Sequence, residues 1–200
     1  MPRIQEPTLR ENRDRRDADL RRAARALLDS EGPDGVSMGA VATAAGLSRA
    51  AAYEYFPSTA DLVCAVIVDE LRAWGRSVTA GRHASDSPEE SVTTFVADSL
   101  RVLTDGTCSP EVIRSALWLP WDARPRTAEA WASVTAGLRS SGGHLLDASI
   151  AQLAATIVLE CALACGDGMP IDDAMTSARG AILGAVGIPS GVPSPPGSRA

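Results

Sequence analysis

Residues 36–56 constrain the fold more than any other part of the chain. They read VSMGAVATAAGLSRAAAYEYF, with Ser37 at the start of one apolar run and Ser48 at the start of the next. Serine at such a position caps a helix, because its side-chain oxygen accepts a hydrogen bond from an N–H group of the first turn. Gly46 between the two runs permits a sharp turn. The segment therefore predicts two short helices that meet at an angle, as in a helix-turn-helix.

Helical periodicity continues through the rest of the chain. Apolar residues recur every three to four positions, beginning with Leu20, Ala24 and Leu28, and aromatic residues make up only 4% of the sequence. This pattern predicts an all-α fold of about nine helices. We expect four regions: a flexible arm over 1–16, a three-helix domain with the helix-turn-helix over 17–57, a second helical domain over 58–187, and a disordered tail over 188–200.

The charge is unevenly distributed. The net charge is −6 and all 19 basic residues are arginine, but residues 1–56 are balanced, so residues 57–200 hold the whole deficit. The four cysteines occur without an export signal, which favours reduced thiols and a cytoplasmic location. The apolar run Ile157–Ala164 is interrupted by Glu160 and is too short to span a membrane. We expect no cofactor and no metal site, and no spacing of nucleophile and base suggests an enzyme.

The second helix of the helix-turn-helix has the chemistry of a DNA-reading surface. Val41, Ala42 and Ala52 are expected to face inward, with Phe56 closing the base. Arg49, Ala50 and the tyrosines would then face outward. In this motif the second helix enters a major groove of DNA by its N-terminal end. An arginine there can bond guanine O6 and N7 together.

The segment from about Leu20 to Leu62 resembles the TetR family of regulators. The resemblance rests on Glu31-Gly32, Val36-Ser37-Met38, Val41-Ala42, Ala45-Gly46-Leu47-Ser48-Arg49, Tyr53, Tyr55-Phe56-Pro57-Ser58 and Asp61-Leu62. It implies that the C-terminal helices bind a small ligand and pair the subunits. The DNA-contacting residues that we predict are Ser37, Thr43, Ser48, Arg49, Ala50, Tyr53 and Tyr55.

Two residues depart from the family pattern. Thr59 stands where the family usually has a phosphate-binding lysine, and Glu54 places a negative charge on the second helix. Both should weaken nonspecific DNA affinity. Arginines of the arm, such as Arg13, would compensate. The alternatives are that Tyr53 and Tyr55 pack between helices and that Arg49 is an ordinary solvated charge.

The C-terminal half offers candidates for a ligand site and a dimer interface. The aromatic residues gathered in or near the middle helices would line a pocket, or else fill the core: Trp74, Phe95, Trp118, Trp121 and Trp131. The last two helices have stripes of small and apolar residues that would pair across a two-fold axis. The interface candidates are Ile157, Cys161, Ala178, Ala181 and Gly184. The alternative is that these stripes pack within one subunit. Cys161 and Cys165 are interpreted as small buried hydrophobes rather than metal ligands.

These observations predict a homodimeric, ligand-responsive DNA-binding regulator of transcription. Its partners would be double-stranded DNA with a palindromic operator and a small-molecule effector. We expect a repressor released by a small apolar or aromatic molecule. The alternative is a helical dimeric interaction or binding module in which DNA reading is weakened, which Glu54 and Thr59 favour.

Overall fold

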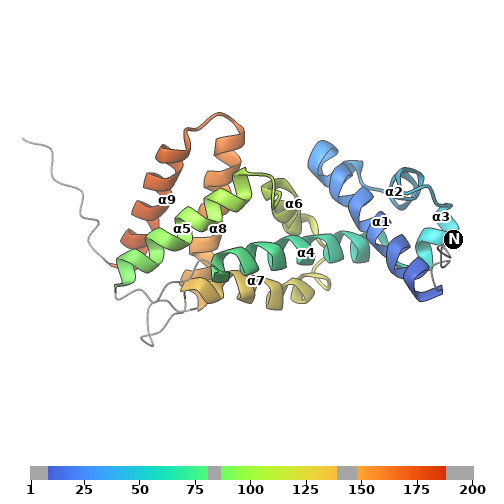
Figure 1. The fold of residues 1–200 in the computed structure, drawn as a ribbon, viewed down its shortest axis with the longest axis horizontal. Coiled ribbons are helices and arrows are strands. Elements are labelled where there is room, and N and C mark those ends of the chain that lie inside the picture. Colours follow the sequence, from blue (N-terminus) through green and yellow to red (C-terminus); the bar gives the residue numbers. More distant parts are fainter. Residues whose placement is uncertain (1–8, 81–86, 139–147, 188–200) are drawn as a thin grey trace, which may run out of the picture.

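The computed structural model describes residues 9–80, 87–138 and 148–187, and within these ranges all regular secondary structure is helical (Figure 1). Nine α-helices lie in the described residues, together with short 3-10 turns, of which Ser115–Trp118 and Arg124–Thr127 lie between α6 and α7. The α-helices are α1 (Leu9–Glu31), α2 (Met38–Ala44), α3 (Arg49–Tyr53), α4 (Thr59–Ala80), α5 (Pro88–Thr104), α6 (Pro110–Arg114), α7 (Ala128–Thr135), α8 (Ala148–Gly166) and α9 (Ile171–Ala185).

The helices form a small head and a larger body. The head comprises α1 to α3 and lies at one end of the molecule, while α5 to α9 form the body (Figure 1). Helix α4 has 22 residues, which corresponds to about 33 Å, and it runs from the head into the body. Contacts of α4 with α1 at one end and with α5 and α7 at the other make it the main connection between the two parts.

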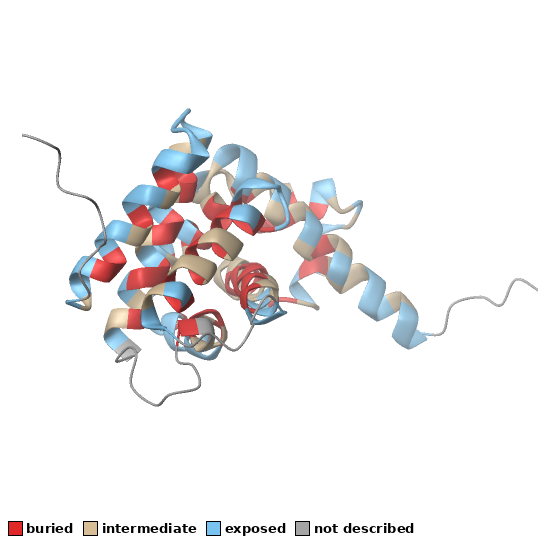
Figure 2. Ribbon diagram, turned by 60° about the vertical axis from the view of Figure 1, so that its left-hand side comes forward, coloured by how far each residue is buried: buried red, intermediate tan, exposed pale blue. Residues whose placement is uncertain are grey.

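The head is built around the residues that the sequence pattern places inside. Leu20, Ala24 and Leu28 form the buried stripe of α1, as their spacing predicts. Helix α2 packs against both α1 and α3, and Figure 2 shows buried positions on the inner sides of the head helices. The residues buried there from the helix-turn-helix are Met38, Val41, Ala42, Ala52 and Phe56.

The body core is closely packed where α4 lies against α7. Gly75 of α4 lies so near α7 that an added Cβ would be 2.5 Å from Ser133 Oγ and 3.0 Å from the Ser133 carbonyl carbon. A side chain at position 75 would therefore collide with backbone, and the glycine is required by close approach. Nearby, Trp74 is completely buried and its Nε1–H donates a hydrogen bond of 2.9 Å to Ser99 Oγ.

Helix α8 is more apolar than the sequence pattern suggested. Its segment Ser149–Gly166 is long and apolar enough to cross a membrane by length and composition alone, contrary to the estimate from the shorter run. In the structure this helix packs against α5, α6, α7 and α9. Only 39% of the segment is buried, so much apolar surface remains on its outer face.

The prediction of a flexible arm over residues 1–16 is wrong for residues 9–16, which form the first turns of α1. Polar side chains one turn apart support this part of the helix. Arg15 donates to Asn12 at 2.8 Å, and Arg22 pairs with Asp19 at 2.8 Å. Interleaved charges that suggested a solvated coil instead stabilise a helix. The predicted tail over 188–200 lies outside the described residues.

Candidate nucleic-acid interface and effector cavity

Two serine caps and one glycine build the angle between α2 and α3. Ser37 Oγ accepts a hydrogen bond from the Ala40 N–H at 3.2 Å, and Ser48 Oγ accepts one from the Ala51 N–H at 3.1 Å. Gly46 has φ +68°, a left-handed conformation that residues with a Cβ rarely adopt. This conformation lets the Leu47 N–H return to the Ala42 carbonyl at 2.8 Å, closing α2. The caps therefore form as the sequence predicts.

The predicted DNA-contacting residues all lie on the outer side of this unit. Six of the seven are exposed, including Tyr53 at 41%, whereas Tyr55 is half-buried against the core. The other exposed members of the set are Ser37, Thr43, Ser48, Arg49 and Ala50. Tyr55 thus shares the interhelical packing that we gave as the alternative for the tyrosines, while Tyr53 projects from the surface.

Arg49 and Tyr53 form a pair on the exposed face of α3. Arg49 Nη2 donates a hydrogen bond of 3.3 Å to the Tyr53 hydroxyl, and the guanidinium lies 5.7 Å from the centre of the tyrosine ring. This hydrogen bond raises the pKa of Arg49, a side chain that is cationic at neutral pH in any case. A helical i, i+4 pair of this kind holds an arginine along the surface that a major groove would meet.

A second arginine reaches this region from α1. The Arg13 guanidinium lies 5.4 Å from the centre of the Tyr55 ring, a cation–π arrangement. The additional turns of α1 therefore end beside the helix-turn-helix. Sequence reasoning named Arg13 as a compensating charge but placed it on a flexible arm, because the contact with Tyr55 joins residues far apart in the sequence.

The predicted aromatic cluster is not a single group. Trp74 and Phe95 are buried in the core, whereas Trp118 is 68% exposed and Trp121 is 83% exposed. Trp131 is half-buried and meets Trp74 edge to face, with ring centres 6.1 Å apart. Periodicity showed that these residues lie in or near helices of the body, but it did not show which neighbours they face. The prediction of one aromatic pocket is wrong for Trp118 and Trp121.

Trp131 does line a cavity, which we name the Trp131 cavity. It has a volume of about 260 Å³, and α6, the turns after it, α7 and α8 contribute its walls. Its apolar wall includes Ile113, Leu117, Trp131 and Leu159. The charged residues Arg114, Arg124 and Glu160 also line it. This combination of apolar walls with a few charged groups is typical of small-molecule sites.

The outer faces of α8 and α9 carry most of the predicted interface residues. Ile157 and Cys161 of α8 are half-buried, and Ala181 and Gly184 of α9 are exposed. Ala178 is completely buried within the subunit, because it faces the core that α9 shares with α5 and α8. It cannot reach a partner, and that part of the prediction is wrong. Burial raises the pKa of Cys161, so its thiol is a neutral part of this apolar face.

Three solved structures share this arrangement of helices. A TetR transcriptional regulator from Rhodococcus sp. RHA1 is 22% identical, with a TM-score of 0.59 over 86% of this chain and 96% of that one. The multidrug binding protein EbrR, complexed with imidazole, is 20% identical, with a TM-score of 0.64 over 93% and 99%. The TetR-like regulator LfrR from Mycobacterium smegmatis, complexed with proflavine, is 15% identical, with a TM-score of 0.59 over 86% and 96%.

The head also matches a family model. Residues 20–66 fit the model described as bacterial regulatory proteins, tetR family. The head is therefore similar to the DNA-binding domain of the TetR family, and the chain as a whole shares the fold of the TetR-family structures. A comparison with curated proteins found no match. The match to the family model identifies residues 20–66 as a helix-turn-helix domain of the type found in bacterial regulatory proteins.

Both departures from the TetR-family pattern lie at the edge of the predicted DNA-contacting surface. Thr59 is the first residue of α4 and is partly exposed, and Glu54 ends α3 with its side chain in solvent. Neither position supplies a cation for a phosphate. Among the described residues, Arg13 is the additional cation that contacts this surface, through the ring of Tyr55.

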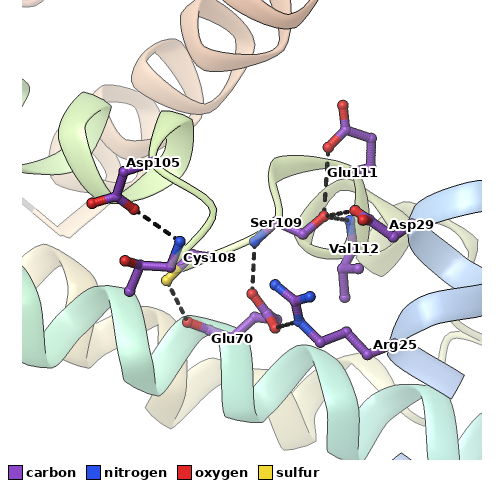
Figure 3. Close-up of polar contacts among 9 residues, drawn as sticks. Arg25, Asp29, Glu70, Asp105, Cys108, Ser109, Glu111 and Val112 are labelled. Carbon is purple, nitrogen blue, oxygen red and sulfur yellow. Dashed lines mark hydrogen bonds and ion pairs between the residues drawn. The ribbon is translucent and has the colours of Figure 1, made fainter. Parts of the chain in front are cut away.

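A polar network joins the TetR-family head to the body (Figure 3). The Glu70 carboxylate of α4 is 8% exposed and accepts hydrogen bonds from Arg25 Nε at 2.5 Å and from the Ser109 N–H at 2.7 Å. The Ser109 hydroxyl caps α6 and donates to Asp29 Oδ1 of α1 at 2.5 Å. Sequence reasoning missed this network. A signal was present, because Glu70 interrupts the buried stripe of α4 between Ile67 and Trp74.

Proposed function

We propose that this chain is a dimeric, ligand-responsive transcriptional regulator, a repressor whose release from a palindromic operator follows the binding of a small apolar or aromatic molecule. The carrying observation is the exposed Arg49–Tyr53 pair on a helix fixed by two serine caps. We assign DNA reading to 17–57 and ligand binding with dimerisation to 58–187.

The proposed base contact is Arg49, with phosphate contacts from Tyr53 and from the capped N-termini of α2 and α3. Arginine presents two donors that match guanine O6 and N7, and N–H groups at a helix start attract phosphate. Two heads related by a two-fold axis would reach successive major grooves about 34 Å apart. The exposed, small-residue face around Ala181 and Gly184, next to the apolar outer face of α8, supports such a pairing.

The proposed effector site is the Trp131 cavity. It lies between α6, α7 and α8, and α4 connects the same region to the head. The related structures of EbrR and LfrR contain the ring compounds imidazole and proflavine. An effector acts only if it binds one arrangement of the two heads more tightly than the other. Movement of α4 is the proposed route, because this helix contacts both α1 and α7.

Selection of binding sites from random DNA with the full chain tests the DNA function. We expect enrichment of a palindrome with half-sites about ten base pairs apart. Arg49→Ala should weaken that site by about 1–3 kcal/mol and relax one base preference in each half-site. Arg101→Ala in α5 is the matched control, since it also removes an exposed arginine, one that pairs only weakly with Asp105 at 3.8 Å. Absence of any enriched sequence would instead favour the weakened-DNA module that Glu54 and Thr59 suggest.

A fluorescence titration tests the effector site, with proflavine as the first probe. Binding in the Trp131 cavity should quench tryptophan emission and release the selected operator. Trp131→Ala should lose this response, whereas Trp118→Ala removes an exposed indole and should retain it. Trp131→Phe keeps an aromatic ring against Trp74. Comparing this variant with Trp131→Ala therefore separates loss of the ligand site from loss of packing in the core. A normal response in Trp131→Ala would place the effector elsewhere.

A further inference from the structure

A second cavity lies at the junction between head and body. Its volume is about 320 Å³, and it is separate from the Trp131 cavity. We name it the junction cavity. Its polar residues include Asp29, Ser109 and Glu111, and its apolar wall includes Leu103, Ala162 and Cys165. It thus lies beside the network of Figure 3, where α1 of the head approaches α5, α6 and α8 of the body.

Negative charge in this lining exceeds positive charge. Arg25 is the one cation of the lining, and the buried Glu70 carboxylate already neutralises it at 2.5 Å. Among the described residues, neither Asp29 nor Glu111 forms an ion pair. The single Ser109 hydroxyl proton serves Asp29 at 2.5 Å, which leaves Glu111 with a contact of 3.5 Å. Two carboxylates therefore line the cavity without a salt bridge to any described residue, and Arg25, which attracts Asp29 less strongly than it attracts Glu70, is already paired with Glu70.

Three helix C-termini add to this negative potential. The cavity is lined by residues from the last turns of α1, α5 and α8, including Asp29, Thr104 and Gly166. The C-terminal end of a helix carries a partial negative charge, because its last carbonyl groups lack partners within the helix. The last turns of α1 and α8 contain no basic residue that would offset it. In α5 the basic residue is Arg101, which faces Asp105 at 3.8 Å.

The remaining groups do not reverse this potential. Helix α6 begins at the cavity, but it has only five residues, and Glu111 lies in its first turn. Burial raises the pKa of Cys108 to about 12, so its thiol is neutral and contributes to the apolar wall.

We propose that the junction cavity binds a small organic cation, such as an amine or amidine. Its charged group would meet Asp29 and Glu111, where charge-assisted hydrogen bonds are available. Its apolar part would lie against Leu103, Ala162 and Cys165. Such a ligand would touch the head and the body together. This site does not depend on the Trp131 cavity being the effector site.

Calorimetric titration of the full chain without DNA tests the proposal with benzamidine and benzamide. The two compounds have nearly the same shape, but only benzamidine is a cation at pH 7. We expect benzamidine to bind at least about tenfold more tightly. Glu111→Gln together with Asp29→Asn should remove most of this preference and leave benzamide unchanged. Added salt should weaken benzamidine selectively.

Two further variants keep the result interpretable. Cys165→Phe, at a half-buried position, should fill the cavity and abolish benzamidine binding. Trp131→Ala should leave it unchanged, since that residue lines the other cavity. Glu111→Gln alone alters only the long contact to Ser109, so this variant should fold normally. It should nevertheless bind benzamidine more weakly than the wild type does. Equal binding of the two compounds, wild-type affinity in Cys165→Phe, or no benzamidine binding at millimolar concentration would overturn the proposal. Operator binding plays no part in these measurements, so they are independent of the proposed function.

Discussion

Truncating Glu70 should destabilise the protein by about 3 kcal/mol. In Glu70→Ala the buried Ser109 N–H loses the acceptor that lies 2.7 Å away, which costs about 1–3 kcal/mol. Arg25 also loses its partner. Removing one member of a buried ion pair costs about 3–5 kcal/mol when the other charge stays buried. The Arg25 side chain is 36% exposed and regains water, so the total should lie at the low end of that range.

Two comparisons isolate the cause of this loss. Glu70→Gln retains an acceptor for Ser109 and nearly the same volume, so we expect a loss of only about 1 kcal/mol. Asp69→Ala removes the neighbouring carboxylate, which also pairs with an arginine of α1, Arg21, at 3.0 Å. The Asp69 side chain is 51% exposed, and the expected loss is below about 0.5 kcal/mol.

Guanidinium denaturation followed by circular dichroism measures these differences. All variants should be compared at one protein concentration, because dimerisation would make stability depend on concentration. A loss of 3 kcal/mol corresponds to a fall in Tm of about 6–12 °C for a chain of this size. The reasoning would be refuted if Asp69→Ala were as costly as Glu70→Ala, or if Glu70→Gln gave the full loss.

Three further changes have defined outcomes. Gly46→Ala should lower the free energy of unfolding, measured by chemical denaturation, by about 1 kcal/mol because of its left-handed φ, since no atom lies within 4 Å of the added Cβ. Gly180→Ala, within α9, should raise it by a similar amount, and a change of the same sign in both variants would contradict this reasoning. Hydrogen bonding to Arg126 lowers the pKa of Asp61, so its contribution to stability is present above the unfolded pKa of about 3.9 and is lost as pH falls through the lower folded value. The stability difference between wild type and Asp61→Asn should therefore shrink on acidification, and a constant difference from pH 6 to 3 would rule this out. Gly184→Leu should leave the subunit folded, because Gly184 has no neighbour within 4 Å, but should block dimerisation in sedimentation, and an unaffected dimer would remove α9 from the interface.

Local signals predicted the head accurately because its geometry is set within a few residues. The caps at Ser37 and Ser48 and the turn at Gly46 each depend on bonds that span at most five positions. The family pattern assigned them roles before any contact was known. The predicted core residues Val41 and Ala52 are buried for the same reason.

Features that depend on distant partners were beyond such reasoning. The hydrogen bonds of Glu70 join residues 39 and 45 positions apart, and no periodicity indicates which arginine or amide will face a buried carboxylate. Trp118 and Trp121 follow a helical stripe, yet a short 3-10 turn after α6 directs that segment to the surface. Ala178 and Ala181 belong to one stripe, but only Ala181 lies on the outer side of α9.

The close crossing at Gly75 gives α4 a mechanical property. We infer that this near-contact of the α4 and α7 backbones resists sliding of one helix along the other and leaves tilting about Gly75 as the easier motion. About 24 Å of α4 lies between this point and Thr59 at the head, against about 8 Å to Ala80 at the other end. Helix α4 is in this sense a lever with unequal arms and its fulcrum at Gly75. If α4 tilts as a rigid rod about Gly75, a displacement of 1 Å at Ala80 corresponds to about 3 Å at Thr59, where the head begins.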